Sequence, residues 1–464
     1  MTADPAASWL FEQEARALLT RLAGVTPFAL QETLVPAAAI SPAALSAIEC
    51  YLITGRNVVG EQVHEFLGWL RGAGRAATPE EQQRRFTAVR LGFNTTLAQM
   101  DLFSEVITQR SEHEIGVWLS GLDVAAAEAL LLPGRFYEAP PVICQLHRGL
   151  GGAIRRARTR LPGGGDNPVS IIRIPRERMI GYGIASSLVH EAGHQGAALL
   201  GLVESLGAEL GRRQRTGDHR DAWVLWESWV SEVVADFWSI AKVGIASTLG
   251  LVGLVSLPRS FVFRMMADDP HPVPWIRVLL SCAIGERLYP AGPRGQWRRL
   301  ASLWREFYPA RGLTPGLRDT LADLERTIPE FASLLAGHRS AALRGRALAD
   351  VLAQPDRAPP RLIRRYRAWG ADPARMHSTP PTLAFAVLGQ ARASGLITPE
   401  KENTLLRGLI TEWALKSTLE TARASAGLGR VPMHMGQPAI WRLADGSAAA
   451  GNERTQLTLN GRRS

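Results

Sequence analysis

Lysine is almost absent from this chain. Only three of its 53 basic residues are lysines, at positions 242, 401 and 416, and all the others are arginines. Together with abundant alanine and glycine, this bias indicates a GC-rich genome, so the net charge of +10 does not by itself indicate a nucleic-acid-binding protein. Two arginine clusters, residues 155–160 and 361–367, leave contact with phosphate or anionic lipid open, although a solvated face is the commoner explanation.

Cysteine is also scarce. Cys50, Cys144 and Cys282 lie far apart and form no CxxC pair. The sequence therefore indicates neither a disulfide framework nor a cysteine-ligated zinc site, and it favours a reducing compartment. The first residues carry acidic side chains and lack the basic segment and apolar core of a secretory signal, so we expect a cytoplasmic protein.

Long apolar runs are missing as well. The longest, Val243 to Pro258, is closed by Arg259 and is shorter than the roughly 20 residues that a membrane-spanning helix needs. We expect this run to form a buried core helix, and peripheral contact with a membrane remains open.

The composition that remains, 46% apolar and 21% charged residues, is typical of globular proteins. Helical patterns separated by proline and glycine turns predict a mainly α fold with a small β-sheet. We predict an N-terminal helical region over residues 1–162, a core over 163–300, a C-terminal helical region over 301–426 and a poorly packed tail over 427–464. The four helices expected first are Trp9–Leu22, Pro42–Leu52, Glu61–Leu70 and Pro79–Leu97.

The predicted core begins with a loop and a strand. The glycine-rich segment 161–168 is typical of a loop, and the β-branched run from Val169 to Ile174 predicts a strand. Pro175 cannot donate a ladder hydrogen bond, so we expect this strand at an edge of the sheet. Two long buried helices are expected next, over about residues 184–206 and 221–245.

The first of these helices carries the motif HEAGH. His190 and His194 are four residues apart, so a helix places both imidazoles on one face, where they can bind one metal ion. Glu191 lies beside such an ion and not on it, which is the position of a general base that activates water. By contrast, His64, His113 and His147 are isolated, and we do not expect them to bind metal.

A catalytic zinc site needs a third protein ligand. The spacing of the metzincin motif is excluded, because Leu200 occupies the position of its third histidine. Among the later candidates, Glu204, Glu209, His219, Glu227 and Glu232, only Glu232 is followed four residues later by an aspartate. We therefore predict that Glu232 binds the metal and that Asp236 orients a ligand histidine.

HExxH followed by ExxxD resembles the gluzincin zinc metallopeptidases. A His-Pro pair at His271 followed by Arg277 makes the chain similar to the CAAX-prenyl-protease and HtpX-like group, over about residues 169–288. The resemblance implies a zincin-like metallopeptidase core, a bound Zn²⁺ and a peptide or protein substrate. It further implies that His271 and Arg277 hold the carbonyl oxygen, and that the strand Val169–Ile174 pairs with an extended substrate.

Two other functions remain open at this stage. The chain can be a non-catalytic helical interaction or scaffold protein, or a zinc hydrolase of a non-peptide amide, whose site chemistry would be the same. The sequence indicates no specific nucleic-acid partner and no particular oligomeric state.

Overall fold

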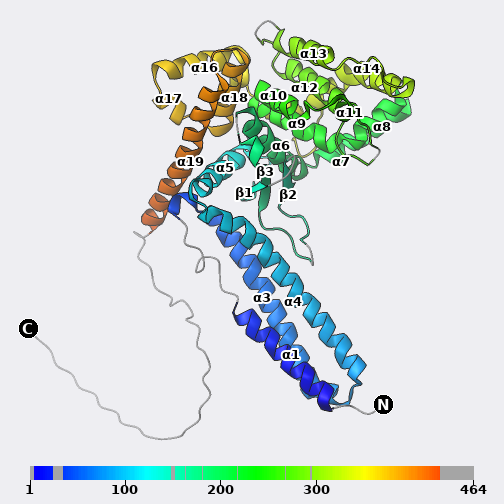
Figure 1. The fold of residues 1–464 in the computed structure, drawn as a ribbon, viewed down its shortest axis with the longest axis vertical. Helices are drawn as coiled ribbons and strands as arrows, with labels where there is room; N and C mark the ends of the chain where they lie inside the picture. Colours follow the sequence, from blue (N-terminus) through cyan, green and yellow to red (C-terminus); the bar gives the residue numbers. More distant parts are fainter. Residues whose placement is uncertain are drawn as a thin grey trace, which may run out of the picture. The chain divides into compact units, whose positions relative to one another are not determined.

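The computed structural model describes residues 5–24, 35–147, 152–161, 164–179, 181–216, 218–266, 268–292 and 295–428. Residues 1–421 form one compact unit and residues 422–464 a second. The described part is mainly helical with one three-stranded sheet, in agreement with the predicted fold class (Figure 1). Within these ranges no helix is both long and apolar enough to cross a membrane.

Three long helices open the chain and pack along one another around a small apolar core of their own: α1 (Pro5–Ala23), α3 (Pro42–Arg71) and α4 (Pro79–Thr108) (Figure 1). Ser41 and Thr78 cap α3 and α4 by accepting backbone hydrogen bonds, and each is followed by a proline. The two helices predicted within residues 42–70 are one, because the segment between them contains no proline to end the first. Short 3₁₀ helices accompany them: η1 (Pro36–Ala38), η2 (Ala73–Ala76) and η3 (Gln109–Ser111).

The sheet has the order β1-β3-β2. β3 (Ser170–Pro175) runs parallel to β1 (Val142–His147) and antiparallel to β2 (Ala153–Arg155). The predicted edge position of the Val169–Ile174 strand is therefore wrong, since it is the central strand. Pro175 is the last residue of β3 and lies beyond its pairing with β2, so its missing N–H interrupts little of the ladder.

Each of the two long helices predicted in the core is broken into two. Gly201, with φ of +57°, separates α6 (Tyr182–Leu199) from α7 (Leu202–Thr216). Trp229 separates α8 (Arg220–Ser228) from α9 (Val230–Val243), and Gly244, with φ of +59°, separates α9 from α10 (Ile245–Val255). α10 is largely buried, as expected for the apolar run. These turns fold α9 back across α6.

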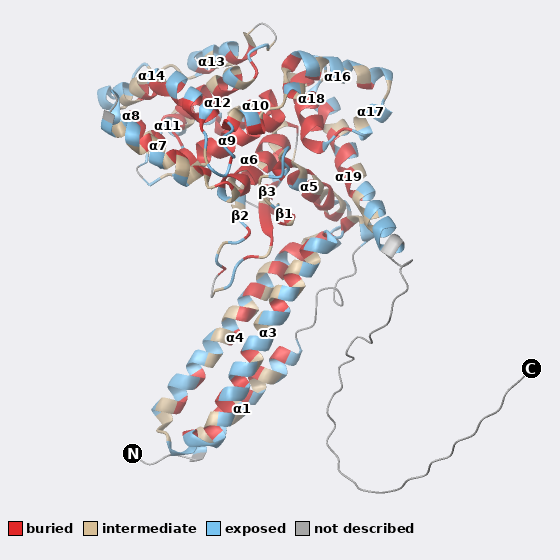
Figure 2. Cartoon of the chain, turned by 180° about the vertical axis from the view of Figure 1, so that it is seen from behind, coloured by how far each residue is buried: buried red, intermediate tan, exposed pale blue. Residues whose placement is uncertain are grey.

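One apolar core extends from Leu119 on α5 (His113–Leu130) to Trp413 on α19 (Pro399–Leu428), and Figure 2 shows its buried residues on α6, α9, α10 and α18. The core thus includes β1 and β2 and most of the predicted C-terminal region, so it is larger than residues 163–300. Most of the predicted tail, from residue 429, lies outside the described residues. The remaining elements are η4 (Arg176–Arg178), α11 (Arg259–Val262), α12 (Pro274–Leu288), α13 (Gln296–Phe307), α14 (Pro315–Gly337), α15 (Leu348–Leu352), η6 (Pro355–Arg357), α16 (Pro359–Ala371), α17 (Ala374–His377) and α18 (Pro381–Ala393).

A buried histidine ties the end of α14 to α7. Nε2 of His338 lies 2.9 Å from Oγ of Ser205, and its Nδ1 lies 3.0 Å from a carboxylate oxygen of Glu209. His338 is 4% exposed, and both ring nitrogens are satisfied. This contact joins the C-terminal helices to the helix that follows the HEAGH motif.

Candidate metal centre

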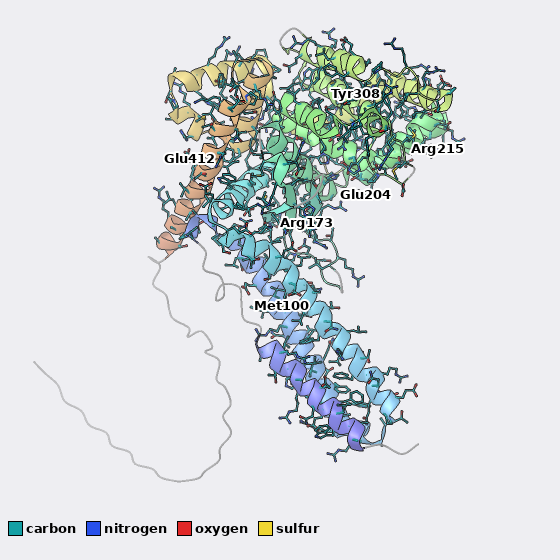
Figure 3. All side chains as sticks on the ribbon, viewed as in Figure 1. Met100, Arg173, Glu204, Arg215, Tyr308 and Glu412 are labelled. Carbon is teal, nitrogen blue, oxygen red and sulfur yellow. The ribbon has the colours of Figure 1, made fainter. Side chains whose placement is uncertain are left out.

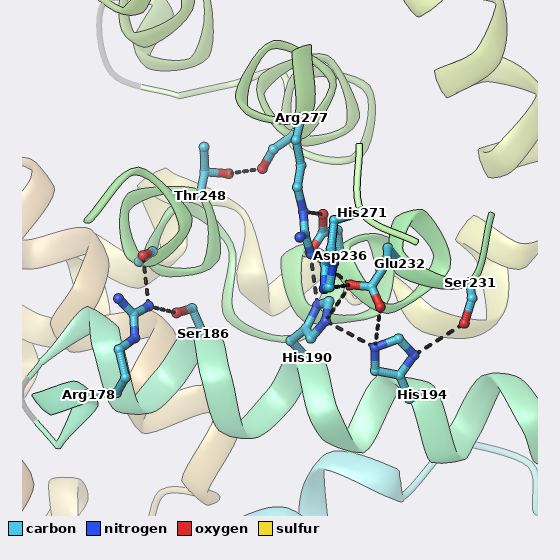
Figure 4. Close-up of polar contacts among 12 residues, drawn as sticks. Arg178, Ser186, His190, His194, Ser231, Glu232, Asp236, Thr248, His271 and Arg277 are labelled. Carbon is cyan, nitrogen blue, oxygen red and sulfur yellow. Dashed lines mark hydrogen bonds and ion pairs between the residues drawn. The ribbon is translucent and has the colours of Figure 1, made fainter. Parts of the chain in front are cut away.

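α6 presents His190 and His194 on one face, and both imidazoles point toward Glu232 on α9 (Figure 4). The two rings stand at 89° with centroids 4.7 Å apart. The side chains of His190, His194 and Glu232 are only 15%, 13% and 10% exposed. Polar groups this deeply buried require partners, and here they face one another.

α9 can lie this close to α6 because two glycines of α6 leave room for Trp238. A Cβ atom at Gly196 would lie 2.3 Å from the Trp238 ring, and one at Gly193 would lie 2.9 Å from the Trp238 Cβ. Nε1 of Trp238 donates a hydrogen bond of 3.0 Å to the carbonyl of Ala129, which fixes the indole. Gly193, inside the HEAGH motif, is thus needed so that α9 can pack closely against α6.

The three side chains fit a single metal ion. Nε2 of His190 lies 3.1 Å from Nε2 of His194, and each of these atoms lies 3.3 Å from an oxygen of Glu232. Bonds of about 2.0–2.1 Å to a tetrahedral ion separate the ligand atoms by about 3.3 Å. Among the described residues, these three side chains offer ligand atoms that lie close enough to one another to hold a metal ion.

The other third-ligand candidates are not near the two histidines. Glu204 is exposed on α7 (Figure 3), and the remaining three contact side chains outside the cluster: Glu209, His219 and Glu227. The sequence pattern favoured Glu232 because an aspartate follows it four residues later. Among the five candidates, Glu232 is the one whose side chain contacts both imidazoles.

Asp236 lies one turn beyond Glu232 and contacts His190 from behind. Its Oδ1 is 2.9 Å from Nδ1 of His190, so the Nε2 atom of that ring is left to face the cluster. Ser231 has the corresponding place beside His194, although its Oγ is 3.5 Å from Nδ1 and the contact is weaker. Asp236 is in the position predicted for a residue that orients a ligand.

Arg277, on α12, holds both carboxylates of α9. Its Nε donates to Asp236 at 2.7 Å, and its Nη2 donates to Asp236 at 2.9 Å and to Glu232 at 3.2 Å. The side chain is 8% exposed. With these donors engaged, Arg277 is placed to position Glu232 and Asp236 rather than to reach the carbonyl oxygen of a substrate, which was the contact predicted for it.

The charges within the cluster support one another. Burial raises the pKa of Glu232, but hydrogen bonds from His190 and His194 outweigh this and hold the pKa far below its usual value. Burial lowers the pKa of His190, yet hydrogen bonds to Asp236 and Glu232 outweigh it and raise the pKa to about 10. Glu232 is therefore a carboxylate at neutral pH, and a metal ion that bound here would displace the proton from His190.

Glu191 lies beside the ligands but binds neither histidine in the described structure. It is 6% exposed, and burial is the main cause that raises the pKa of its carboxyl group. Gly152, the residue before β2, faces this carboxylate so closely that a Cβ there would lie 2.6 Å from Oε1 of Glu191. Glycine at position 152 therefore leaves the room that the Glu191 carboxylate occupies.

His271 approaches the cluster from the connection between α11 and α12 (Figure 4). Its Nε2 lies 3.4 Å from an oxygen of Glu232, and its Nδ1 lies 2.8 Å from Asp269. With half of its side chain exposed, His271 lies at the solvent side of the site. Asp269 fixes the ring so that Nε2 faces inward, a contact that the sequence pattern did not predict.

β2 lies close to Glu191, since Gly152 directly precedes it. Among the described residues it pairs only with β3, and the sheet order places it at an edge. β3 is paired on both sides over Ile171–Arg173, so it does not offer the free edge that the resemblance implied for the Val169–Ile174 strand.

A scan against protein-family models finds no match, and searches of curated proteins and of solved structures find no significant similarity either.

Sequence reasoning missed three residues of the site: Gly152, Ser231 and Asp269. Ser231 directly precedes Glu232 and Asp269 lies two residues before His271, so the signal available was their nearness to predicted site residues. Gly152 carries no such signal, because its importance comes only from the side chain that packs against it.

Proposed function

We propose that this chain is a zinc-dependent metallopeptidase with a zincin-like core, in which His190, His194 and Glu232 hold the metal. The observation that carries the proposal is the set of 3.1–3.3 Å separations among their ligand atoms, with Glu191 one residue from the first histidine. Two nitrogens and one oxygen are a ligand set that catalytic zinc commonly has, with a fourth position left for water or substrate.

When bound, zinc supplies Lewis acidity, which lowers the pKa of water and polarises a carbonyl group. Glu191 accepts the proton of the attacking water and delivers it to the leaving amine. Its burial supports this role, because a carboxylate away from bulk water binds a proton more readily. Asp236 and Arg277 hold the ligands in place and do not touch the reacting atoms.

His271 is the group that we assign to the carbonyl oxygen, with Asp269 holding its ring. Its Nδ1 lies 2.8 Å from Asp269, and its Nε2 is the ring atom that faces the developing negative charge. The main chain of an extended peptide adds to the outer edge of β2, next to Gly152 and Glu191.

Metal analysis and cleavage together test this proposal. The full chain is loaded with zinc and desalted, and its metal content is measured by mass spectrometry. We expect one zinc per wild-type chain and none in His190→Ala or Glu232→Ala. Glu191→Gln is expected to keep its zinc and to cleave a mixed peptide library at least about 100-fold more slowly, because it lacks the general base.

Glu204→Gln is the matched control, since Glu204 is an exposed glutamate on the neighbouring helix α7, and it should behave as wild type. Cleavage by Glu191→Gln at the wild-type rate would contradict the mechanism. If the wild-type chain binds zinc but cleaves no peptide, a non-peptide amide is favoured as the substrate. If it neither binds zinc nor cleaves a peptide, a scaffold protein is favoured.

A further inference from the structure

A small cavity lies directly beside the metal centre. Its volume is about 200 Å³, and His271 and Arg277 form part of its wall. Both residues also contact Glu232, at 3.4 and 3.2 Å, so the cavity opens next to the metal ligands. It is distinct from β2, since its lining comes from α10, α12 and the segments that precede α9 and α12.

The cavity is lined mainly by large apolar side chains. Trp229 and Val255 are buried, at 3% and 8% exposed, and Leu254 and Met265 are half-buried. Met266 lies at the rim and is 43% exposed. Methionine side chains adapt to the shape of what they contact, so such a wall accommodates more than one apolar group.

Two of the three charged groups of the wall are already paired: Arg277 donates to Asp236 and Glu232, and Asp269 binds His271. The third, Arg264, is exposed and lies over the Phe261 ring. A charged group that entered the cavity beside Arg277 and Asp269 would lose its hydration without gaining a free partner there, which is unfavourable. An apolar group would gain from leaving water.

The volume limits what can bind there. Sites that enclose a whole drug-sized ligand usually measure about 300–1,000 Å³, so about 200 Å³ suits a single side chain better than a complete small molecule. Since the cavity adjoins the metal ligands, the side chain that fills it belongs to a residue next to the bond under attack.

We infer that this cavity is a specificity pocket that binds a large apolar side chain of the substrate, branched or aromatic, beside the scissile bond. This inference rests on the proposed metallopeptidase function. It goes beyond that function by naming the class of peptide: one with a leucine-like or phenylalanine-like residue at the cleavage site.

The test uses zinc-loaded full-length protein and four peptide hydroxamates that are identical except for one side chain, that of Leu, Phe, Ala or Asp. A hydroxamate binds the metal, so its affinity can be measured by calorimetry without a known substrate. We expect the Leu and Phe compounds to bind at least about 10-fold more tightly than the Ala compound, since single methylene groups in apolar pockets change affinity by about 10- to 200-fold. The Asp compound should bind more weakly than the Leu and Phe compounds.

Two variants fill the pocket from different walls, Leu254→Trp and Met265→Trp. Both positions are half-buried, so a larger side chain has room to adjust. Each variant should retain zinc and bind the Ala compound as wild type does, while the preference for Leu and Phe falls to about twofold or less. Val224→Trp is the control, because Val224 is 45% exposed on α8 and does not line the cavity, and it should keep the preference.

The outcomes separate the two proposals. Equal affinity for all four hydroxamates in zinc-loaded wild type would overturn the pocket while leaving the metallopeptidase proposal intact. A preference that survives unchanged in both tryptophan variants would also overturn the pocket. Failure of the wild type to bind zinc would overturn the proposed function and, with it, the pocket.

Discussion

Replacement of Arg277 by methionine should destabilise the protein strongly, because it removes the cation that two buried carboxylates share. Arg277 donates to Asp236 at 2.7 and 2.9 Å and to Glu232 at 3.2 Å, and all three side chains are at most 13% exposed. Removal of one partner from a buried ion pair costs about 3–5 kcal/mol, since the remaining charge keeps its desolvation penalty. That is a large part of the roughly 5–15 kcal/mol by which proteins are usually stable.

Urea unfolding at pH 7, followed by circular dichroism, measures this loss in Arg277→Met. Arg305→Met is the matched control, because Arg305 pairs with Glu325 at 2.7 Å but is 45% exposed. An exposed pair of this kind contributes about 0–1 kcal/mol. Addition of Asp236→Asn to Arg277→Met should recover part of the loss, as it removes the uncompensated charge.

Excess zinc should also reduce the effect of Arg277→Met, because a cation bound by Glu232 replaces part of the lost positive charge. The reasoning would be refuted if Arg277→Met lost no more stability than Arg305→Met. It would also be refuted if adding Asp236→Asn to Arg277→Met lowered the free energy of unfolding by a similar amount again. Either result would mean that Arg277 does not hold the two carboxylates.

Three further predictions concern packing and buried charge. Gly196→Ala forces a methyl group against Trp238, so we expect a loss of about 1–3 kcal/mol in urea unfolding and weaker zinc binding in a titration. Gly253→Ala, which meets no neighbour within 4 Å, should be neutral or stabilising by up to about 1 kcal/mol. Burial lowers the pKa of Lys242 from 10.5 to about 8, so between these values the unfolded chain binds a proton that the folded chain lacks, and stability should rise with pH by about 3 kcal/mol relative to Lys242→Met. If the free energy of unfolding changed with pH in the same way in the wild type and in Lys242→Met, Lys242 would not be the cause of the pH dependence. His338→Gln loses the ring that joins its serine and glutamate partners on α7 and should cost about 1–3 kcal/mol in the same unfolding assay, whereas an unchanged midpoint would contradict the role of that contact.

The three candidate metal ligands were predictable from local patterns. Helical periodicity alone places His190 and His194 on one face, because residues four apart recur after about one turn. The choice of Glu232 depended on a second local pattern, a carboxylate followed four residues later by Asp236 within an apolar helix. A buried carboxylate in such surroundings needs a partner, and the structure brings it to both histidines.

The breaks in the long helices were not predictable from those patterns. Apolar periodicity continues across residues 184–206 and 221–245, and the left-handed backbone of Gly201 and Gly244 interrupts it. A glycine within a helical pattern is compatible with either outcome, since it weakens a helix without ending it. Packing of the following segment decides which outcome occurs.

The central position of β3 was likewise decided by segments outside that strand. Pro175 predicted an edge, but a proline removes only its own donor, and the pairing of β3 is decided by β1 and β2. In the same way, the partners of Arg277 and the room that Gly152 leaves for Glu191 depend on segments far away in the sequence.

By itself the sequence determined the mainly helical class, the spacing of the two histidines and the residue that completes their triad. The tertiary structure alone decided which strand is central, what Arg277 holds and where a cavity remains beside the candidate metal centre. The physical reason is the distance along the sequence between the residues in contact. Spacing within one helix follows from the geometry of a single turn, whereas contacts between distant segments follow from the free energy of packing the whole core.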